Sequence, residues 1–224
     1  MSRGLGDVYK RQDNYIYQMN FLTLFLLSSI TAQHCPIVNT QTNFNLTEYI
    51  RERWYIQQQQ ITSYLPLEEN YCVTAKYNIS DRKILGYKGV VLNVYNYANL
   101  HKVNGKQANK HNQVLCARVP DQTVPSKLLV APCFLPNVFA GDYWVIAAGP
   151  KSDNYEWAIV SGGQPTVQYK DGCTTKTSGS NGAGFWYFSR VPVASDNVIK
   201  KLNKIAKSKG CLLYTSPSPR DIPL

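Results

Sequence analysis

The sequence predicts an all-β fold, an eight-stranded antiparallel up-and-down barrel with a C-terminal α-helix packed outside. Three observations predict it. Eight short runs are rich in aromatic and β-branched residues, turn-forming residues separate them, and no helical pattern intervenes. Closing such strands into a barrel removes edges that would otherwise pair with other chains. The runs are 54–59, 70–79, 87–97, 112–119, 127–132, 142–149, 155–162 and 184–191.

The last three runs carry the strongest signal. DYWVIAAG (142–149), YEWAIVSG (155–162) and GFWYFSRV (184–191) are separated by turn residues, as in strands that pair in sequence. Arg190 lies at the end of the last run, and Trp54 opens the first run of the barrel. Setting this Arg against this Trp would bring the two ends of the sheet together, which indicates a closed barrel.

After the last strand the sequence changes to a helical period. In SDNVIKKLNKIAKSKG (195–210) the apolar residues fall on one face, which we expect to pack on the barrel. Ser195 is the predicted N-cap, and Gly210 ends the helix. The apolar residues are Val198, Ile199, Leu202, Ile205 and Ala206. Near the front, Asn45 or Thr47 is expected to cap a short turn of helix.

The two ends of the chain are expected to lie outside the fold. MNFLTLFLLSSITA (19–32) reads as a secretory signal peptide, the alternatives being a buried strand or a membrane anchor. Residues 1–12 and 211–224 resemble translated sequencing-adapter read-through, which leaves 33–210 as the domain. The alternatives are a longer signal-peptide start, with Lys10 and Arg11 as its charges, and a disordered tail.

Cysteines in a secreted domain are expected to form disulfides. Cys116 and Cys133 lie at the outer ends of two adjacent runs, so a hairpin would bring them together as a bridge. Spacing alone does not pair Cys35, Cys72 and Cys173, and Cys211 falls in the excluded tail. Two sequons, at Asn45 and Asn78, predict N-glycosylation on the surface.

The chain is basic, with a formal net charge of +10. Such a charge is compatible with nucleic acid or an anionic membrane surface. The charges are scattered, however, apart from one lysine cluster in the C-terminal helix. We therefore predict no nucleic-acid partner and regard the cluster as a solvated face, with weak association with an anionic membrane as the alternative. We expect a monomer or a weak dimer. The cluster is Lys200, Lys201, Lys204, Lys207 and Lys209.

An eight-stranded barrel is wide enough to hold one small ligand or to be filled by its own side chains. Because alternate residues point inward, apolar residues of two strands share a face. In the last strand both parities are aromatic, so periodicity does not decide between Trp186/Phe188 and Phe185/Tyr187. An interior of this kind favours a flat or chain-like apolar ligand. The apolar residues that share a face are Val73, Ala75 and Tyr77 in the run 70–79, and Val90, Leu92 and Val94 in the run 87–97.

Five motifs together resemble the lipocalins, most closely the apolipoprotein D and bacterial lipocalin branch. They are RWYI (53–56), YCVTAKYNI (71–79), DYWVIAAG (142–149), YEWAIV (155–160) and FSRVP (188–192), in the family's order over residues 35–209. The resemblance implies that Arg190 packs over Trp54 at the closed end of the barrel, as a structural cation–π pair. One departure is Glu52, where the family has Gly.

The resemblance also implies positions for ligand contacts and disulfides. Tyr77 and Trp186 match ligand-contact positions, which selects Trp186 and Phe188 as the inward pair. Cys35 is expected to bridge to Cys173, and Cys72 to a cysteine beyond the C-terminal helix. The ligand-binding residues that we predict are Tyr77, Val90, Leu92, Val94, Trp186 and Phe188.

The sequence thus predicts a secreted carrier of a small hydrophobic ligand, such as a lipid, fatty acid, retinoid or carotenoid, with no chemistry and no cofactor. Two alternatives remain: a lipocalin-fold enzyme resembling the carotenoid de-epoxidases, and a protein-binding module that uses the loops at the barrel mouth. No metal site is predicted, because His34, His101 and His111 form no ligand pattern. No nucleophile elbow or paired-carboxylate site is visible.

Overall fold

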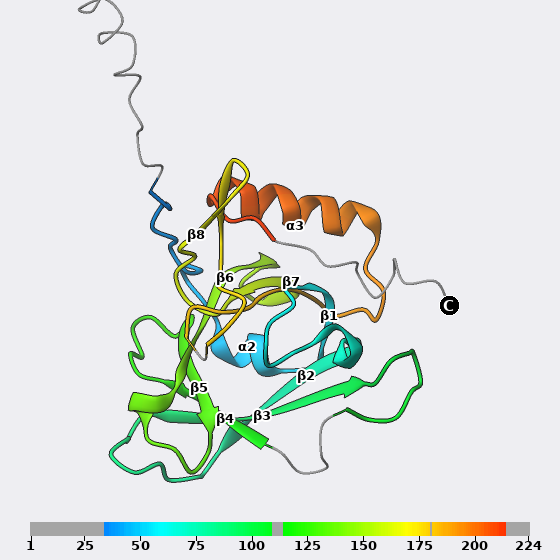
Figure 1. The fold of residues 1–224 in the computed structure, drawn as a ribbon. Coiled ribbons are helices and arrows are strands. Elements are labelled where there is room, and N and C mark those ends of the chain that lie inside the picture. The colour runs from blue at the N-terminus through cyan, green and yellow to red at the C-terminus, as the bar shows by residue number, and fades with distance from the viewer. Residues whose placement is uncertain (1–33, 109–113, 180, 214–224) are drawn as a thin grey trace, which may run out of the picture. The chain divides into compact units, whose positions relative to one another are not determined.

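In the computed structural model, the described residues are 34–108, 114–179 and 181–213 (Figure 1). The described residues from Cys35 to Leu213 belong to one compact unit. The predicted signal peptide (19–32) and the predicted N-terminal read-through (1–12) lie outside the described residues. Of the predicted C-terminal read-through (211–224), only residues 211–213 are described.

The eight predicted runs form the strands of a closed antiparallel barrel, which confirms the predicted fold class. Around the barrel the strand order is β1-β10-β7-β6-β5-β4-β3-β2, so the last strand pairs with the first. The strands are β1 (Trp54–Gln59), β2 (Tyr71–Ser80), β3 (Val90–Asn99), β4 (Val114–Val119), β5 (Lys127–Pro132), β6 (Gly141–Lys151), β7 (Asn154–Ser161) and β10 (Phe185–Ser189).

A small hairpin between β7 and β10 was not predicted from the sequence. It consists of β8 (Val167–Tyr169) and β9 (Gly172–Thr174), which pair with each other and not with the barrel. Two 3₁₀ turns, η1 (Leu67–Glu69) and η2 (Asn137–Phe139), lie in other connections. Strands of three residues are too short to show a period-2 pattern, so periodicity could not reveal them.

Both predicted helices are present, and their N-caps are side-chain caps. α2 (Leu46–Ile50) begins after Asn45, whose side chain accepts a hydrogen bond from the Glu48 amide. α3 (Asp196–Ser208) begins after Ser195, which caps the Val198 amide in the same way. α3 lies across the outside of the barrel near β7 (Figure 1).

Two apolar clusters decide which face of the last strand points inward. Trp186 and Phe188 belong to the cluster inside the barrel, as predicted. Phe185 and Tyr187 belong to a second cluster, outside the barrel, together with the buried Leu202 of α3. Aromatic side chains lie on both faces of β10 because both faces are buried, one inside the barrel and the other against α3.

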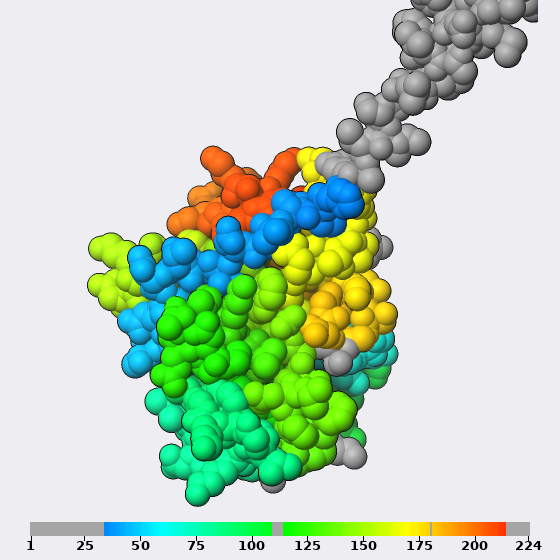
Figure 2. Space-filling model, turned by 90° about the vertical axis from the view of Figure 1, so that its left-hand side faces the viewer, coloured from blue at the N-terminus to red at the C-terminus, as the bar shows by residue number. Residues whose placement is uncertain are grey.

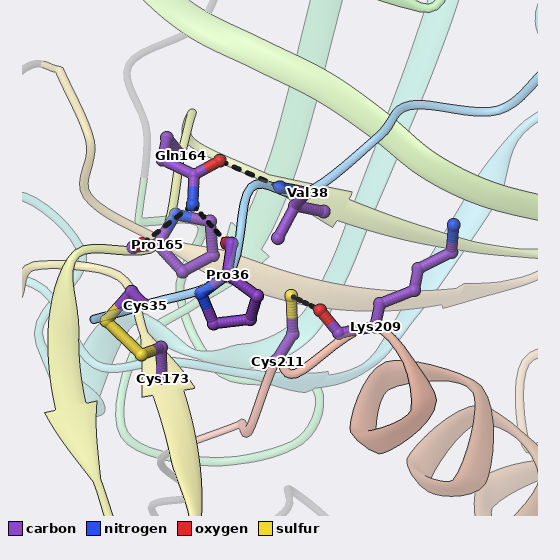
Figure 3. Close-up of a disulfide and its surroundings, with 8 residues drawn as sticks. All are labelled: Cys35, Pro36, Val38, Gln164, Pro165, Cys173, Lys209 and Cys211. Carbon is purple, nitrogen blue, oxygen red and sulfur yellow. Dashed lines mark hydrogen bonds between the residues drawn. A yellow bond between two sulfur atoms is a disulfide. The ribbon is translucent and has the colours of Figure 1, made fainter. Parts of the chain in front are cut away.

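The two predicted disulfides are present. Cys35 is bonded to Cys173, with 138 residues of sequence separation, and Cys116 to Cys133, with 17. The first fastens the N-terminal segment to β9 (Figure 3). Figure 2 shows this segment (blue) running along the surface beside α3 (orange to red). Cys72 is not disulfide-bonded in the structure, so the bridge that the resemblance implied for it is not formed among the described residues.

Residues just beyond the predicted domain boundary at Gly210 pack on the unit. Cys211 is a free, fully buried thiol in the outer cluster, close to the Cys35–Cys173 disulfide (Figure 3). Its neighbour Leu212 donates its amide hydrogen to the Cys173 carbonyl (2.7 Å). Burial raises the pKa of the Cys211 thiol to about 12.

The two disulfides should differ in their effect on stability. In the chain-entropy account, closing the 138-residue loop contributes about 5 kcal/mol and the 17-residue loop about 3 kcal/mol. We therefore expect Cys35→Ser/Cys173→Ser to lower the free energy of unfolding more than Cys116→Ser/Cys133→Ser does. Urea denaturation of the two double variants measures this difference, and the reverse order would contradict it.

Candidate ligand-binding interior of the barrel

One end of the barrel is closed by Arg190, which follows β10. Its guanidinium lies 3.5 Å from the centroid of the Trp54 ring, as predicted. It also donates hydrogen bonds of 2.5–3.3 Å to five backbone carbonyls. Burial lowers the pKa of Arg190 to about 10, which still leaves it charged at neutral pH. The carbonyls belong to Glu48, Tyr49, Glu52, Arg53 and Tyr155.

The short helix α2 supplies two of these acceptors. The last carbonyls of a helix have no partner within it and carry partial negative charge, so a cation is favoured there. The Tyr49 carbonyl accepts from Arg190 and also from the Trp54 indole nitrogen (2.9 Å). Glu52, where the resemblance to the lipocalins predicted Gly, offers Arg190 its backbone oxygen. The substitution is therefore compatible with closure of this end.

Three tyrosine hydroxyls meet inside the barrel. Tyr143 of β6 lies 2.7 Å from the hydroxyl of Tyr49 and 2.7 Å from that of Tyr77. Each phenol oxygen can donate one hydrogen bond and accept two, so the three satisfy one another in an apolar setting. Burial raises the pKa of all three phenols, so they stay uncharged at neutral pH.

The interior also has partly buried side chains toward the opposite end. Four inward-facing side chains there are only partly buried: Leu115, Val130, Tyr143 and Trp186. Leu92, Ala158 and Phe188, farther along the interior, are buried. Val90, the first residue of β3, is partly exposed at the closed end, and Ile56 is partly exposed as well. Leu46 and Ile50 of α2 are partly buried too, so partly buried side chains lie toward both ends of the interior. The loops 60–70, 133–140 and 162–184 surround the end opposite Arg190.

Two of these loops are tied together over the open end. The buried Gln60 side chain donates to the Thr175 carbonyl (2.8 Å) and accepts from the Gly184 amide (3.2 Å). The Tyr64 hydroxyl donates to the Ala183 carbonyl (2.9 Å). These hydrogen bonds hold the loop after β1 against the loop before β10.

Gly184 positions Trp186. Its φ is +97°, a region that L side chains rarely adopt. A Cβ at Gly184 would lie 2.2 Å from the Trp186 ring and 2.7 Å from the Tyr64 hydroxyl. The absent side chain thus lets the indole lie against the loop at the open end.

The six predicted ligand-binding residues lie in one cluster inside the barrel. Tyr77, Leu92, Val94 and Phe188 are buried, whereas Val90 and Trp186 are partly exposed. Sequence reasoning missed Tyr49, Tyr143 and Gln59. The alternation of DYWVIAAG puts Tyr143 on the same face as Val145, which could have identified it. The pattern of the sequence offers no comparable signal for Tyr49, which lies outside the strands.

Among the described residues, no group of three or more His, Cys, Asp or Glu side chains could hold a metal ion. The helices in the same part of the chain include none with the length and hydropathy of a membrane span.

Comparison with solved structures identifies the fold. A cockroach protein, the major allergen Per a 4, superposes with a TM-score of 0.50 and 15% identity, over 83% of this chain and 94% of that one. The chain has the lipocalin fold. Apocrustacyanin C2 superposes with a TM-score of 0.47 and 15% identity, over 86% of this chain and 97% of that one. No family model and no curated protein matches the chain.

Replacing Arg190 should destabilise this lipocalin barrel strongly. Arg190→Leu leaves several carbonyls at the closed end without a donor, and we expect a loss of about 3–5 kcal/mol in the free energy of unfolding. Arg51→Leu is the control. Arg51 pairs with Glu48 at 2.7 Å on the surface, so its loss should cost at most about 1 kcal/mol. Equal effects of the two variants in urea denaturation would contradict the role of Arg190.

The tyrosine cluster predicts a loss of stability in alkali. Burial raises the phenol pKa values in the folded state above the unfolded value of 10.0, so the folded state holds more protons above that pH. Stability should therefore be unaffected below about pH 10 and fall as the pH rises further. Phenolate absorbance and urea denaturation at pH 8 and pH 11 measure this fall, and Tyr77→Phe/Tyr143→Phe should reduce it. A fall of the same size in that variant would exclude the cluster as its cause.

Proposed function

We propose that this protein is a carrier in the lipocalin family that binds a small hydrophobic ligand inside the barrel and performs no chemistry on it. The observation that supports this most is an apolar interior with inward-facing side chains that are only partly buried. Arg190 and Trp54 close one end, while Leu115, Val130 and Trp186 face inward and stay partly exposed at the other. An apolar interior that opens at one end is suited to a lipid, fatty acid, retinoid or carotenoid.

The apolipoprotein D and bacterial lipocalin branch is our proposal for the position of the chain within that family. Its support is the Cys35–Cys173 disulfide and the Arg190–Trp54 pair, both implied by the resemblance to that branch. Secretion is part of the proposal, because disulfides form in oxidising compartments. Asn45 and Asn78 are both exposed, as glycosylated residues of a secreted protein would be.

We propose a monomer or weak dimer, with at most weak attraction to anionic membranes. The helical lysines are the argument for such attraction, yet several have partners within the protein. Lys207 pairs with Asp171 at 2.6 Å, Lys201 lies 4.9 Å from the Trp157 ring, and Lys209 donates to the Asn39 carbonyl. These contacts reduce the charge that the helix can offer to a membrane surface.

Filling the interior near the open end should weaken binding. Wild-type protein should show saturable quenching of tryptophan fluorescence with at least one of retinol, a fatty acid or a carotenoid, since Trp186 lies in the proposed site. Val130→Phe places a ring in the interior and should weaken binding about 5- to 150-fold, because overpacking costs about 1–3 kcal/mol.

The matched control is Val193→Phe, which makes the same change at a side chain that is 71% exposed. It should bind as the wild type does. Extraction of the bound compound should return it chemically unchanged. If none of the three ligand classes changes the tryptophan fluorescence, the carrier proposal is wrong. If the extracted compound is chemically altered, the protein is an enzyme instead.

A further inference from the structure

We propose that Gln59 recognises a hydroxyl group of the ligand, so that the barrel carries an uncharged, mainly aliphatic alcohol. This inference rests on the proposed carrier function and specifies its ligand class. It starts from an amide that is placed inside the barrel without a partner.

Gln59 is the last residue of β1, and its Cα pairs with that of Trp186. Because residues paired across strands share a face, the Gln59 side chain lies on the inward face beside Trp186. The residue is only 7% exposed. Neither its Nε2 nor its Oε1 has a hydrogen-bond partner among the described residues.

Two neighbouring glutamines differ from Gln59. Gln57 and Gln60 are also buried, yet both atoms of each amide are hydrogen-bonded. In the outward-facing Gln58 only Oε1 is buried without a partner. Gln57 donates to the Val191 carbonyl and accepts from the Ala194 amide. A buried amide without partners is destabilising, and native structures contain few of them. An inward amide that costs stability is expected where a ligand supplies the missing hydrogen bonds.

The chemistry of the amide selects the ligand group. Nε2 donates and Oε1 accepts, and a hydroxyl can accept from the first and donate to the second. A carboxylate only accepts, so it would leave Oε1 unpaired and place a negative charge beside it. The strand residues that share the inward face are uncharged, and no cation among them could neutralise a carboxylate. The interior therefore favours an uncharged alcohol over an acid.

Trp186 is the side chain that a ligand must move to reach Gln59. Both amide atoms are inaccessible to solvent, whereas Trp186 beside them is partly exposed at the open end. Its ring lies against Gly184 and Tyr64, which belong to the loops around that end. Binding at Gln59 should therefore change the fluorescence of Trp186.

The test uses three probes with the same chain length: 1-dodecanol, 1-chlorododecane and dodecanoate at pH 8. Affinities are measured on the full chain by tryptophan fluorescence. The wild type should bind dodecanol more tightly than dodecanoate. Gln59→Leu should lower the affinity for dodecanol about tenfold, the size of one or two hydrogen bonds, and leave chlorododecane within about twofold. It should also raise the stability of the empty protein, because it removes an unpartnered amide.

Gln58→Leu is the matched control, since Gln58 pairs with the outward-facing Tyr187. It should leave all three affinities unchanged. Equal losses for all three probes in Gln59→Leu, or a wild-type preference for dodecanoate, would overturn the inference and leave the carrier proposal standing. If none of the three probes binds, and retinol and a carotenoid do not bind either, both the carrier proposal and the inference about Gln59 are wrong. If Gln59→Leu does not fold, Gln59→Met supports the same comparison.

Discussion

The structure depends on the guanidinium of Arg190, which joins the end of β10 to the beginning of β1. It covers the Trp54 ring and binds carbonyls from α2, from the residues before β1 and from the start of β7. A lysine carries the same charge on a compact ammonium with three donors, so it could not reach as many acceptors as the planar guanidinium. Because one residue satisfies these carbonyls together, the barrel can close at this end without a larger hydrophobic plug.

Closure at one end makes the two halves of the interior different. Around Trp54 the rings of Tyr49 and Phe188 pack at 5.2 Å and 5.9 Å, which leaves an aromatic layer without charge. Above it the hydroxyls of Tyr143 and Tyr77 bond each other, so they too add no charge. Near the open end, the inward-facing amide of Gln59 has no partner among the described residues. A ligand that enters from that end would reach this amide by displacing Trp186.

Local patterns in the sequence were enough to predict the strands and the helix, because period 2 and period 3.6 report burial directly. Pairing of Trp54 with Arg190, and of Cys35 with Cys173, needed the family resemblance, since both join residues more than 130 positions apart. The prediction that Trp186 points into the barrel also needed the family resemblance. Because α3 covers the outer face of β10, both faces of that strand are apolar and the pattern does not distinguish them. Gln59 was not predictable: the β-bulge at Gln57 shifts the register, and strict alternation from Trp54 puts Gln59 on the outer face.

The most direct test of the proposed binding site is a crystal structure that shows where a ligand binds. A crystal of the protein with 12-bromododecan-1-ol bound would locate the bromine by anomalous scattering and the hydroxyl by its density. The account predicts an alkyl chain inside the barrel, among Leu115, Val130 and Tyr143, with the hydroxyl beside Gln59. A chain bound on the outer surface, with the interior side chains unmoved, would contradict it.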